Sequence, residues 1–157
     1  IPGLDDSKKL SEKKRNEMFQ IISDRALAIG TGMADNNTID EINILNATKQ
    51  AMRQAVAEAE KQLGDAIGHV LVDAVTIEGI GNEQTAIIKG DAKSISIAAA
   101  SIIAKVTRDN MMKEYALEYP YYAFESNKGY GTKAHYQGIN EHGITPIHRK
   151  TFLKGIL

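Results

Sequence analysis

The sequence predicts an α/β fold in which a sheet is flanked by helices. Two short apolar runs, residues 70–72 and 85–88, have the length and composition of buried strands. The segment from Ser94 to Leu117 is apolar nearly all round in its first half and rich in alanine, which is typical of a helix that packs closely against a sheet. With 157 residues, of which 43% are hydrophobic, the chain is long enough to bury a core.

Further helices are predicted before the first strand. Ser11 can cap a helix whose apolar face includes Met18. Thr38 and Glu41 have the spacing of a capping box, and apolar residues continue at helical spacing to Leu63.

The remaining elements are predicted from alternation and from punctuating residues. Residues 27–33 alternate in the manner of a half-buried strand, although two glycines weaken that prediction. Pro120 ends the long helix, and residues 129–131, Gly-Tyr-Gly, indicate a turn. Thr132 can then cap a last helix that Gly143 closes.

The amino-acid composition restricts the kinds of metal site, the mode of nucleic-acid binding and the cellular location that we expect. The absence of cysteine excludes a thiolate metal site, so a bound metal needs oxygen or imidazole ligands, which favours Mg²⁺ or Mn²⁺ over structural zinc. A net charge of −1 argues against a protein that coats nucleic acid non-specifically. The longest apolar stretch is too short to span a bilayer and no basic leader opens the chain, so we expect a cytoplasmic protein that binds no membrane.

Two carboxylates follow the predicted strands. Asp73 ends the first apolar run, and Asp91 follows the second within the tripeptide Lys-Gly-Asp at residues 89–91. Since α/β folds place ligand-binding groups just beyond strand ends, both carboxylates could face one site and share a hard divalent cation. The alternative that each is a loop aspartate capping a turn has about equal weight, and the tripeptide by itself is more typical of a simple turn.

Basic residues gather in several places, some with aromatic neighbours, as in proteins that contact phosphates and bases. For the charged run at residues 13–15 the interpretation as a solvated helix face is preferred. Tyr130 differs, because its flanking glycines make an exposed, positioned ring at least as reasonable as a packed one. His148 beside Arg149 is more often a structural arrangement.

These segments together resemble the ribonuclease HII family, in the same order and over essentially the whole chain. The most distinctive match is K-G-D at residues 89–91 followed by S-I-A-A-A-S-I-x-A-K-V-x-R-D at residues 96–109. Further matches are G-L-N/D-D-S-K-K-L-S at residues 3–11, I-D-E-x-N-I-x-x-A-T-x-x-A-M at 39–52, the L-I-D strand end at 71–73, K-G-Y-G-T-x-x-H at 128–135 and H-R-x-S-F at 148–152.

The resemblance implies an RNase H-like mixed sheet flanked by helices, with a C-terminal helical segment and a four-carboxylate site for two Mg²⁺ or Mn²⁺ ions. Asp73 and Asp91 match two of the four catalytic and metal-binding positions. The other two family carboxylates belong to D-E-x-G-R-G, a motif that this sequence does not contain. We therefore expect a single RNase H-like domain over residues 1–157 that lacks the family's first two strands, with residues 119–157 as its substrate-binding helical part.

For function, the resemblance implies an endoribonuclease that cuts the RNA strand of RNA/DNA hybrids and DNA duplexes at embedded ribonucleotides. One ion would activate a water for in-line attack and the other would stabilise the leaving 3′-oxygen, which leaves 5′-phosphate and 3′-hydroxyl ends. Tyr130 would stack on the deoxyribose that follows the ribonucleotide. Phosphates would be held by Lys8, Lys9, Lys128 and Arg149.

Two other classes remain open: a catalytically silent module that binds RNA/DNA hybrids, and an α/β domain whose carboxylates hold a small sugar. Asp109 matches the family motif too, but after Lys105 and Arg108 on a helix it is interpreted as an ion-pairing residue. Without the motif-bearing strands we expect this chain alone to be inactive or nearly so, and to self-associate through unpaired strand edges.

Overall fold

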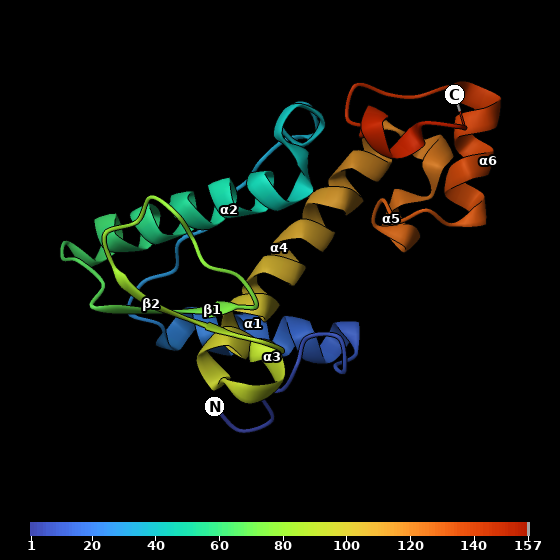
Figure 1. Cartoon of the computed structure of the whole chain (residues 1–157). Coiled ribbons are helices and arrows are strands. Elements are labelled where there is room, and N and C mark those ends of the chain that lie inside the picture. The colour runs from blue at the N-terminus through green and yellow to red at the C-terminus, as the bar shows by residue number, and fades with distance from the viewer. Residues whose placement is uncertain (157) are drawn as a thin grey trace. The chain divides into compact units, whose positions relative to one another are not determined.

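The computed structural model describes residues 1–156 and confirms the α/β class (Figure 1). The chain divides into two compact units. The first unit comprises Ile1–Ala104 together with the residues from Arg149 on, and the second comprises Lys105–His148. The single domain over residues 1–157, with a substrate-binding part at 119–157, stays a prediction.

The first helix of the first unit is the one expected. Helix α1 spans Glu12–Arg25, and the Ser11 hydroxyl accepts a hydrogen bond from the Lys14 N–H at 3.2 Å. Met18 and Ile22 are buried on its inner face. The predicted cap at Ser11 is confirmed.

Helix α2, Asn36–Leu63, begins earlier than predicted. The cap is Asp35, whose carboxylate accepts from the Thr38 N–H at 2.8 Å, so the capping box at Thr38 was wrong. The Asp35 side chain lies before the first turn and binds the same free backbone N–H group that the capping box would have bound. The helix is interrupted at Asn43, which has a φ of 70° and caps the continuing helix by accepting from the Asn46 N–H.

The predicted strand at residues 27–33 was wrong, because this segment belongs to no strand in the part of the chain that the structure describes. Its backbone binds side chains of α2: the Ile29 N–H donates to Gln62 and the Met33 N–H donates to Gln54. Gly30 and Gly32 lie directly on the α2 backbone, since an added Cβ would come within 2.0 Å of the nearest α2 carbonyl oxygen at either glycine. The segment therefore packs closely on helix α2 instead of pairing with a strand.

The sheet of the described residues consists of two parallel strands, β1 (His69–Asp73) and β2 (Glu83–Ile87). The connection between them carries no helix and is anchored by side chains instead. Asn82 donates to the Glu60 carboxylate on α2, and the Gln84 amide binds both the N–H and the carbonyl of Ile77. Lys49 of α2 pairs with Glu78 of the same connection at 2.7 Å. The anchored connection fixes the register that pairs Asp73 with Ile87.

After β2 come the short helix α3 (Gly90–Lys93) and the long helix α4 (Ile95–Glu118), which runs from the first unit into the second. Val72 of β1 and Ile97 and Ile102 of α4 belong to the core. Several large apolar side chains of the first unit are nevertheless exposed, among them Leu71 at 41% and Ile88 at 71%. In the described residues, one part of the small sheet is thus left without a cover.

The second unit is helical. It contains the end of α4, the 3-10 helix η1 (Pro120–Tyr122), α5 (Phe124–Asn127) and α6 (Lys133–His142). The predicted cap at Thr132 and stop at Gly143 are confirmed. The rings of Tyr122 and Phe124 stack in its core with centroids 5.4 Å apart.

The chain returns to the first unit with the 3-10 helix η2 (Lys150–Leu153). The Asp40 carboxylate accepts hydrogen bonds from the Lys150 and Thr151 N–H groups, each at 2.9 Å, and from the Thr151 hydroxyl. These bonds, that of the Thr151 hydroxyl first, hold the pKa of Asp40 below its ordinary value. Among the described helices, none has an apolar stretch long enough to cross a membrane.

Candidate metal and nucleic-acid site

The parallel register brings Asp73 next to the Lys-Gly-Asp segment. Asp73 ends β1 opposite Ile87, the last residue of β2, and its carboxylate accepts a hydrogen bond from the Gly90 N–H at 2.8 Å. Asp91 follows Gly90 directly, so the two aspartates predicted from the sequence lie at the same end of the sheet. Carboxyl ends of parallel strands are where α/β proteins place ligand-binding groups.

The backbone on either side of this junction is strained. Ala74, which follows Asp73, has a φ of 64°, and Lys89, which precedes Gly90, has a φ of 54°. Each non-glycine residue in this left-handed region costs about 1–2 kcal/mol. Strain of this kind gathers at functional sites, where the surrounding structure holds the chain in an unfavourable conformation.

Gly90 allows a close approach, but to protein atoms. An added Cβ would lie 2.5 Å from the Ile97 side chain of α4 and 3.3 Å from the Asp73 carboxylate. The missing side chain lets the strand end, α4 and Asp73 meet at this point. Its close packing keeps the Gly90 N–H aimed at Asp73.

The carboxylate ligands in this region are of the type that a hard divalent cation prefers, but they are too few to form a complete metal site. Asp73 is exposed and offers carboxylate oxygens, as does the partly exposed Asp91. Within residues 1–156, however, no group of three or more His, Asp or Glu side chains lies close enough to hold a metal ion. Asp73 and Asp91 therefore fit a metal as part of a larger ligand set.

Lys8 and Lys9 lie exposed on the loop before α1. Arg15 of α1 holds this loop by donating to the backbone carbonyls of Ser7 and Leu10. The Lys9 ammonium lies 3.8 Å from the Asp5 carboxylate. Arg15 was interpreted from the sequence as part of a solvated charge run, and no spacing rule would have found its role in shaping the loop.

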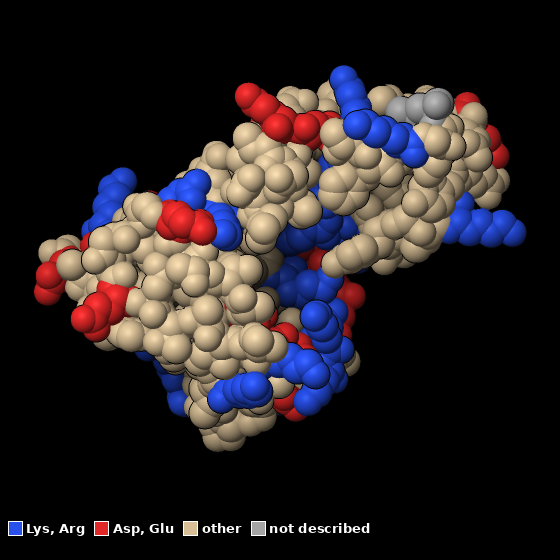
Figure 2. Space-filling view, in the orientation of Figure 1, with Lys and Arg blue, Asp and Glu red and all other residues tan. Residues whose placement is uncertain are grey.

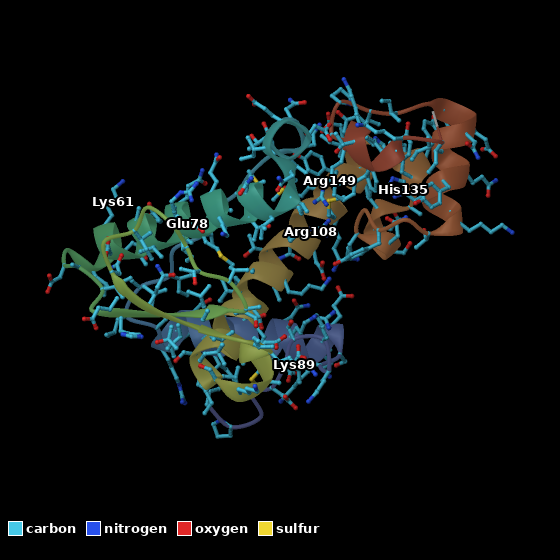
Figure 3. All side chains as sticks on the ribbon, in the orientation of Figure 1. Lys61, Glu78, Lys89, Arg108, His135 and Arg149 are labelled. Carbon is cyan, nitrogen blue, oxygen red and sulfur yellow. The ribbon has the colours of Figure 1, made fainter. Side chains whose placement is uncertain are left out.

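In the second unit, Tyr130 presents an exposed ring on a tightly held turn. Its side chain is flanked by cations, with the Lys105 ammonium 5.7 Å and the Arg108 guanidinium 5.4 Å from the ring centroid. Arg108, which is labelled in Figure 3, also donates to the Lys128 carbonyl at 2.7 Å and thereby fixes the start of the turn. The expected exposure is confirmed at 62%, and the positive charge beside the ring suits a phosphate-bearing strand.

Two other predicted phosphate contacts have partners within their own unit. Lys128 is 8% exposed, and its ammonium donates to the Glu125 carbonyl. Arg149 precedes η2 and has its guanidinium 5.3 Å from the centre of the Phe152 ring. On the drawn face of the first unit, basic and acidic side chains are interspersed (Figure 2).

Asp109 is buried and paired with Lys105 at 3.0 Å, which confirms its predicted ion-pairing role.

Comparisons with known proteins agree with this reading of the residues. The family model described as Ribonuclease HII matches residues 2–154. The chain is 58% identical to a ribonuclease HII of Clostridioides difficile (strain 630) and 50% identical to one of Acetivibrio thermocellus. Each match covers all 157 residues of this chain and 60% of the relative, so the chain spans a little under two thirds of the relatives' length. On these matches and on the motifs that the strand ends carry, the chain belongs to the ribonuclease HII family.

Proposed function

We propose that the protein to which this chain belongs is a metal-dependent endoribonuclease that cleaves the RNA strand of RNA/DNA hybrids and cuts duplex DNA at embedded ribonucleotides. The proposal rests on family membership together with one structural observation, the junction of Asp73 with Gly90-Asp91 at the ends of two parallel strands. Of the classes considered, only a nuclease needs carboxylates held at that place together with exposed lysines and an exposed tyrosine.

In this proposal Asp73 and Asp91 hold Mg²⁺ or Mn²⁺ as part of a larger ligand set. Divalent cations at such carboxylates supply positive charge to a phosphodiester and lower the pKa of a nearby water. The Gly90 N–H fixes one oxygen of Asp73, which orients the carboxylate before any ion binds. The exposure of Asp73 leaves that carboxylate accessible to solvent and substrate.

The exposed cations and the tyrosine would bind the nucleic acid. Tyr130 stacks on a sugar of the strand, and its neighbours Lys105 and Arg108 attract the flanking phosphates. Lys8 and Lys9 are exposed and suited to phosphate contact, and the half-buried Arg149 is a further candidate. Lys128 would exchange its hydrogen bond to the Glu125 carbonyl for one to a phosphate oxygen.

A second candidate is a module that binds hybrids without cutting them. It is favoured by a single observation: residues 1–156 hold no cluster of three potential metal ligands. Mg²⁺ can be held by one or two carboxylates together with substrate phosphates, so the two aspartates leave any ion dependent on further ligands.

The two candidates separate in one experiment. The full-length protein is incubated with a DNA duplex that carries one ribonucleotide, with Mg²⁺, with Mn²⁺ or with EDTA. The proposal expects metal-dependent incision that leaves a 5′-phosphate and a 3′-hydroxyl, and no incision of the matched all-DNA duplex. Tight binding without incision supports the silent module, and neither binding nor incision rejects both.

A further inference from the structure

Asp109 of α4 is a charged residue on the buried face of a helix. Within the second unit, Val106, Asp109 and Ala116 follow the helical repeat, and they are 4%, 6% and 9% exposed. Apolar side chains are usual at such positions, because an ionised carboxylate loses its hydration when it is buried. An ionised Asp109 is therefore stable there only with a partner that supplies positive charge.

The partner is Lys105, one helical turn earlier on α4. Its ammonium donates to Asp109 Oδ1 at 3.0 Å, and the Lys105 side chain is 28% exposed whereas that of Asp109 is 8% exposed. The pair therefore has a buried acidic end and a basic end that reaches solvent. Replacing a buried ion pair by apolar residues is often neutral or even stabilising, so stability alone gives no reason for a carboxylate here.

The ammonium is held beside an exposed aromatic ring. Lys105 Nζ lies 5.7 Å from the centroid of the Tyr130 ring, which belongs to a side chain that is 62% exposed. Holding a long lysine side chain in one geometry costs conformational entropy, and the buried acceptor offsets this cost before any ligand arrives. The Asp109 carboxylate thus keeps the lysine charge at the ring.

Arg108 supplies a second cation at the same ring, and it has an anchor of its own. Its guanidinium carbon lies 5.4 Å from the Tyr130 centroid, and its Nη1 donates to the Lys128 carbonyl at 2.7 Å. Gly129 follows with a φ of 85°, and an added Cβ there would lie 3.5 Å from Arg108 Nη2. The backbone of the turn thus positions this cation without a carboxylate.

Both cations have more donors than these anchors use. Asp109 engages one of the three N–H donors of the Lys105 ammonium, and the Lys128 carbonyl engages one of the five of the Arg108 guanidinium. Two cations and one carboxylate leave the cluster with one net positive charge, which matches the single negative charge of a phosphodiester. Anchored cations next to an exposed ring suit a strand whose phosphate meets the cations while its sugar or base lies against the ring.

We propose that Asp109 is a positioning residue for substrate binding: its buried carboxylate holds the Lys105 ammonium in place for a phosphate of the nucleic-acid strand. Arg108 binds the same phosphate from its own anchor, and the sugar next to that phosphate lies against the Tyr130 ring. This inference rests on the proposed function, because the strand is the proposed substrate. It gives Asp109 a task beyond the ion pair itself.

The first test uses the sign of the effect of Asp109→Asn in the full-length protein, with KM and kcat measured on a duplex that carries one ribonucleotide. The substitution keeps the volume and releases the ammonium, so KM should rise about 2- to 5-fold with little change in kcat. If Asp109 did no more than repel the phosphate, its removal would lower KM instead. A lower kcat and melting temperature with unchanged KM would make Asp109 a purely structural residue.

The second test separates folding from the binding contact. Lys105→Gln should raise KM and lower the melting temperature, because it leaves the buried carboxylate without a cation. In the double variant Lys105→Gln/Asp109→Asn, the two amides can form a hydrogen bond one turn apart without any charge. The melting temperature should then return towards the wild-type value, while KM should stay as high as in Lys105→Gln. Recovery of KM together with the melting temperature would overturn the proposal.

The third test counts the phosphate contact and needs no catalysis. Affinity for the matched all-DNA duplex is measured by fluorescence anisotropy in EDTA at several salt concentrations. A lost phosphate contact reduces the slope of log affinity against log salt by about 0.9, so Lys105→Gln should show that reduction. Asp109→Asn should weaken binding at every salt concentration with the slope little changed, because the lysine charge remains.

Lys61→Gln is the matched control for the slopes. Lys61, which is labelled in Figure 3, is an exposed lysine in the last turn of α2, in the first unit, and its loss should leave the slope as in the wild type. An unchanged slope in Lys105→Gln, or an equal reduction in the control, would overturn the phosphate contact. If the wild type fails to cut the ribonucleotide duplex, the proposed function fails, and the slopes on DNA still decide whether Lys105 binds a phosphate.

Discussion

The Asp73 carboxylate accepts a hydrogen bond from the Gly90 N–H across the ends of two parallel strands. This bond joins the strand end of β1 to the segment that carries Asp91, and it orients a carboxylate that is otherwise exposed. Both predicted metal ligands therefore depend on a backbone contact between residues that lie 17 positions apart in the sequence.

Replacing Asp73 by Asn in the full-length protein should abolish metal-dependent cleavage with little loss of thermal stability, because the charge is removed at constant volume. Since loss of an outer-shell partner alone costs about 10–100-fold, a lost ligand should lower kcat by at least about 100-fold. Asp91→Asn should act in the same direction, less severely if Asp91 contacts a single ion. Asp65→Asn, at an exposed turn, is the matched control. A wild-type rate in Asp73→Asn would remove Asp73 from the metal site.

Gly90→Ala tests whether the junction itself matters. The added Cβ would meet Ile97 at 2.5 Å, so the strand end must shift and unfolding should become easier by about 1–3 kcal/mol. The same shift moves the N–H that orients Asp73, so kcat should fall as well. Gly81→Ala, where no atom lies within 4 Å of the added Cβ, should change neither quantity. Equal effects of the two substitutions on kcat would argue against a special role for Gly90.

Tyr130→Ala should weaken cleavage by about 1–3 kcal/mol if the ring stacks on nucleic acid. The loss should fall on KM, because the ring is exposed and makes little contribution to the core. Tyr121→Ala is a close control, since Tyr121 is 60% exposed in the same unit and stacks on His142. A lower melting temperature with unchanged kinetics would show that the Tyr130 ring merely packs.

The 157-residue chain by itself should be inactive or nearly so on a duplex with one ribonucleotide, because its described residues hold no cluster of three metal ligands. It should also self-associate, since Leu71 and Ile88 at the small sheet are exposed. Activity assays and size-exclusion chromatography, with and without a peptide that carries the D-E-x-G-R-G strand of the family, test both statements. Robust cleavage by a monomeric chain would mean that the site has been placed wrongly.

The stability of the protein should decrease on acidification in a manner that depends on His148. Its pKa is lowered by burial, so below its ordinary value of 6.5 the unfolded chain takes up a proton that the folded chain resists. Stability from this group is therefore fully present above pH 6.5 and is lost as the pH falls towards the folded pKa. Melting temperatures measured between pH 8 and 5 should show a smaller decline for His148→Phe than for the wild type. Equal declines would assign the acid sensitivity to other groups.

Local sequence determined much of this protein. The two apolar runs that end in carboxylates became β1 and β2, and Ser11, Thr132 and Gly143 mark helix ends where their side-chain and backbone chemistry predicts them. Such signals are readable because they involve residues within one turn of each other. The pairing of Lys105 with Asp109 followed for the same reason, from spacing on a single helix.

Tertiary structure decided what distant residues do to one another. Residues 27–33 alternate like a strand, yet Gly30 and Gly32 let them pack on the backbone of α2, where Gln54 and Gln62 bind their N–H groups. Thr38 has the spacing of a cap, but the helix is capped by Asp35, whose carboxylate accepts a hydrogen bond from the Thr38 N–H. A hydrogen bond between the buried Nε2 atoms of His135 and His148 joins residues 13 apart, and no periodicity in the sequence predicts it. Burial and hydrogen bonding across space set these outcomes, because a buried polar group must find a partner wherever the fold places one.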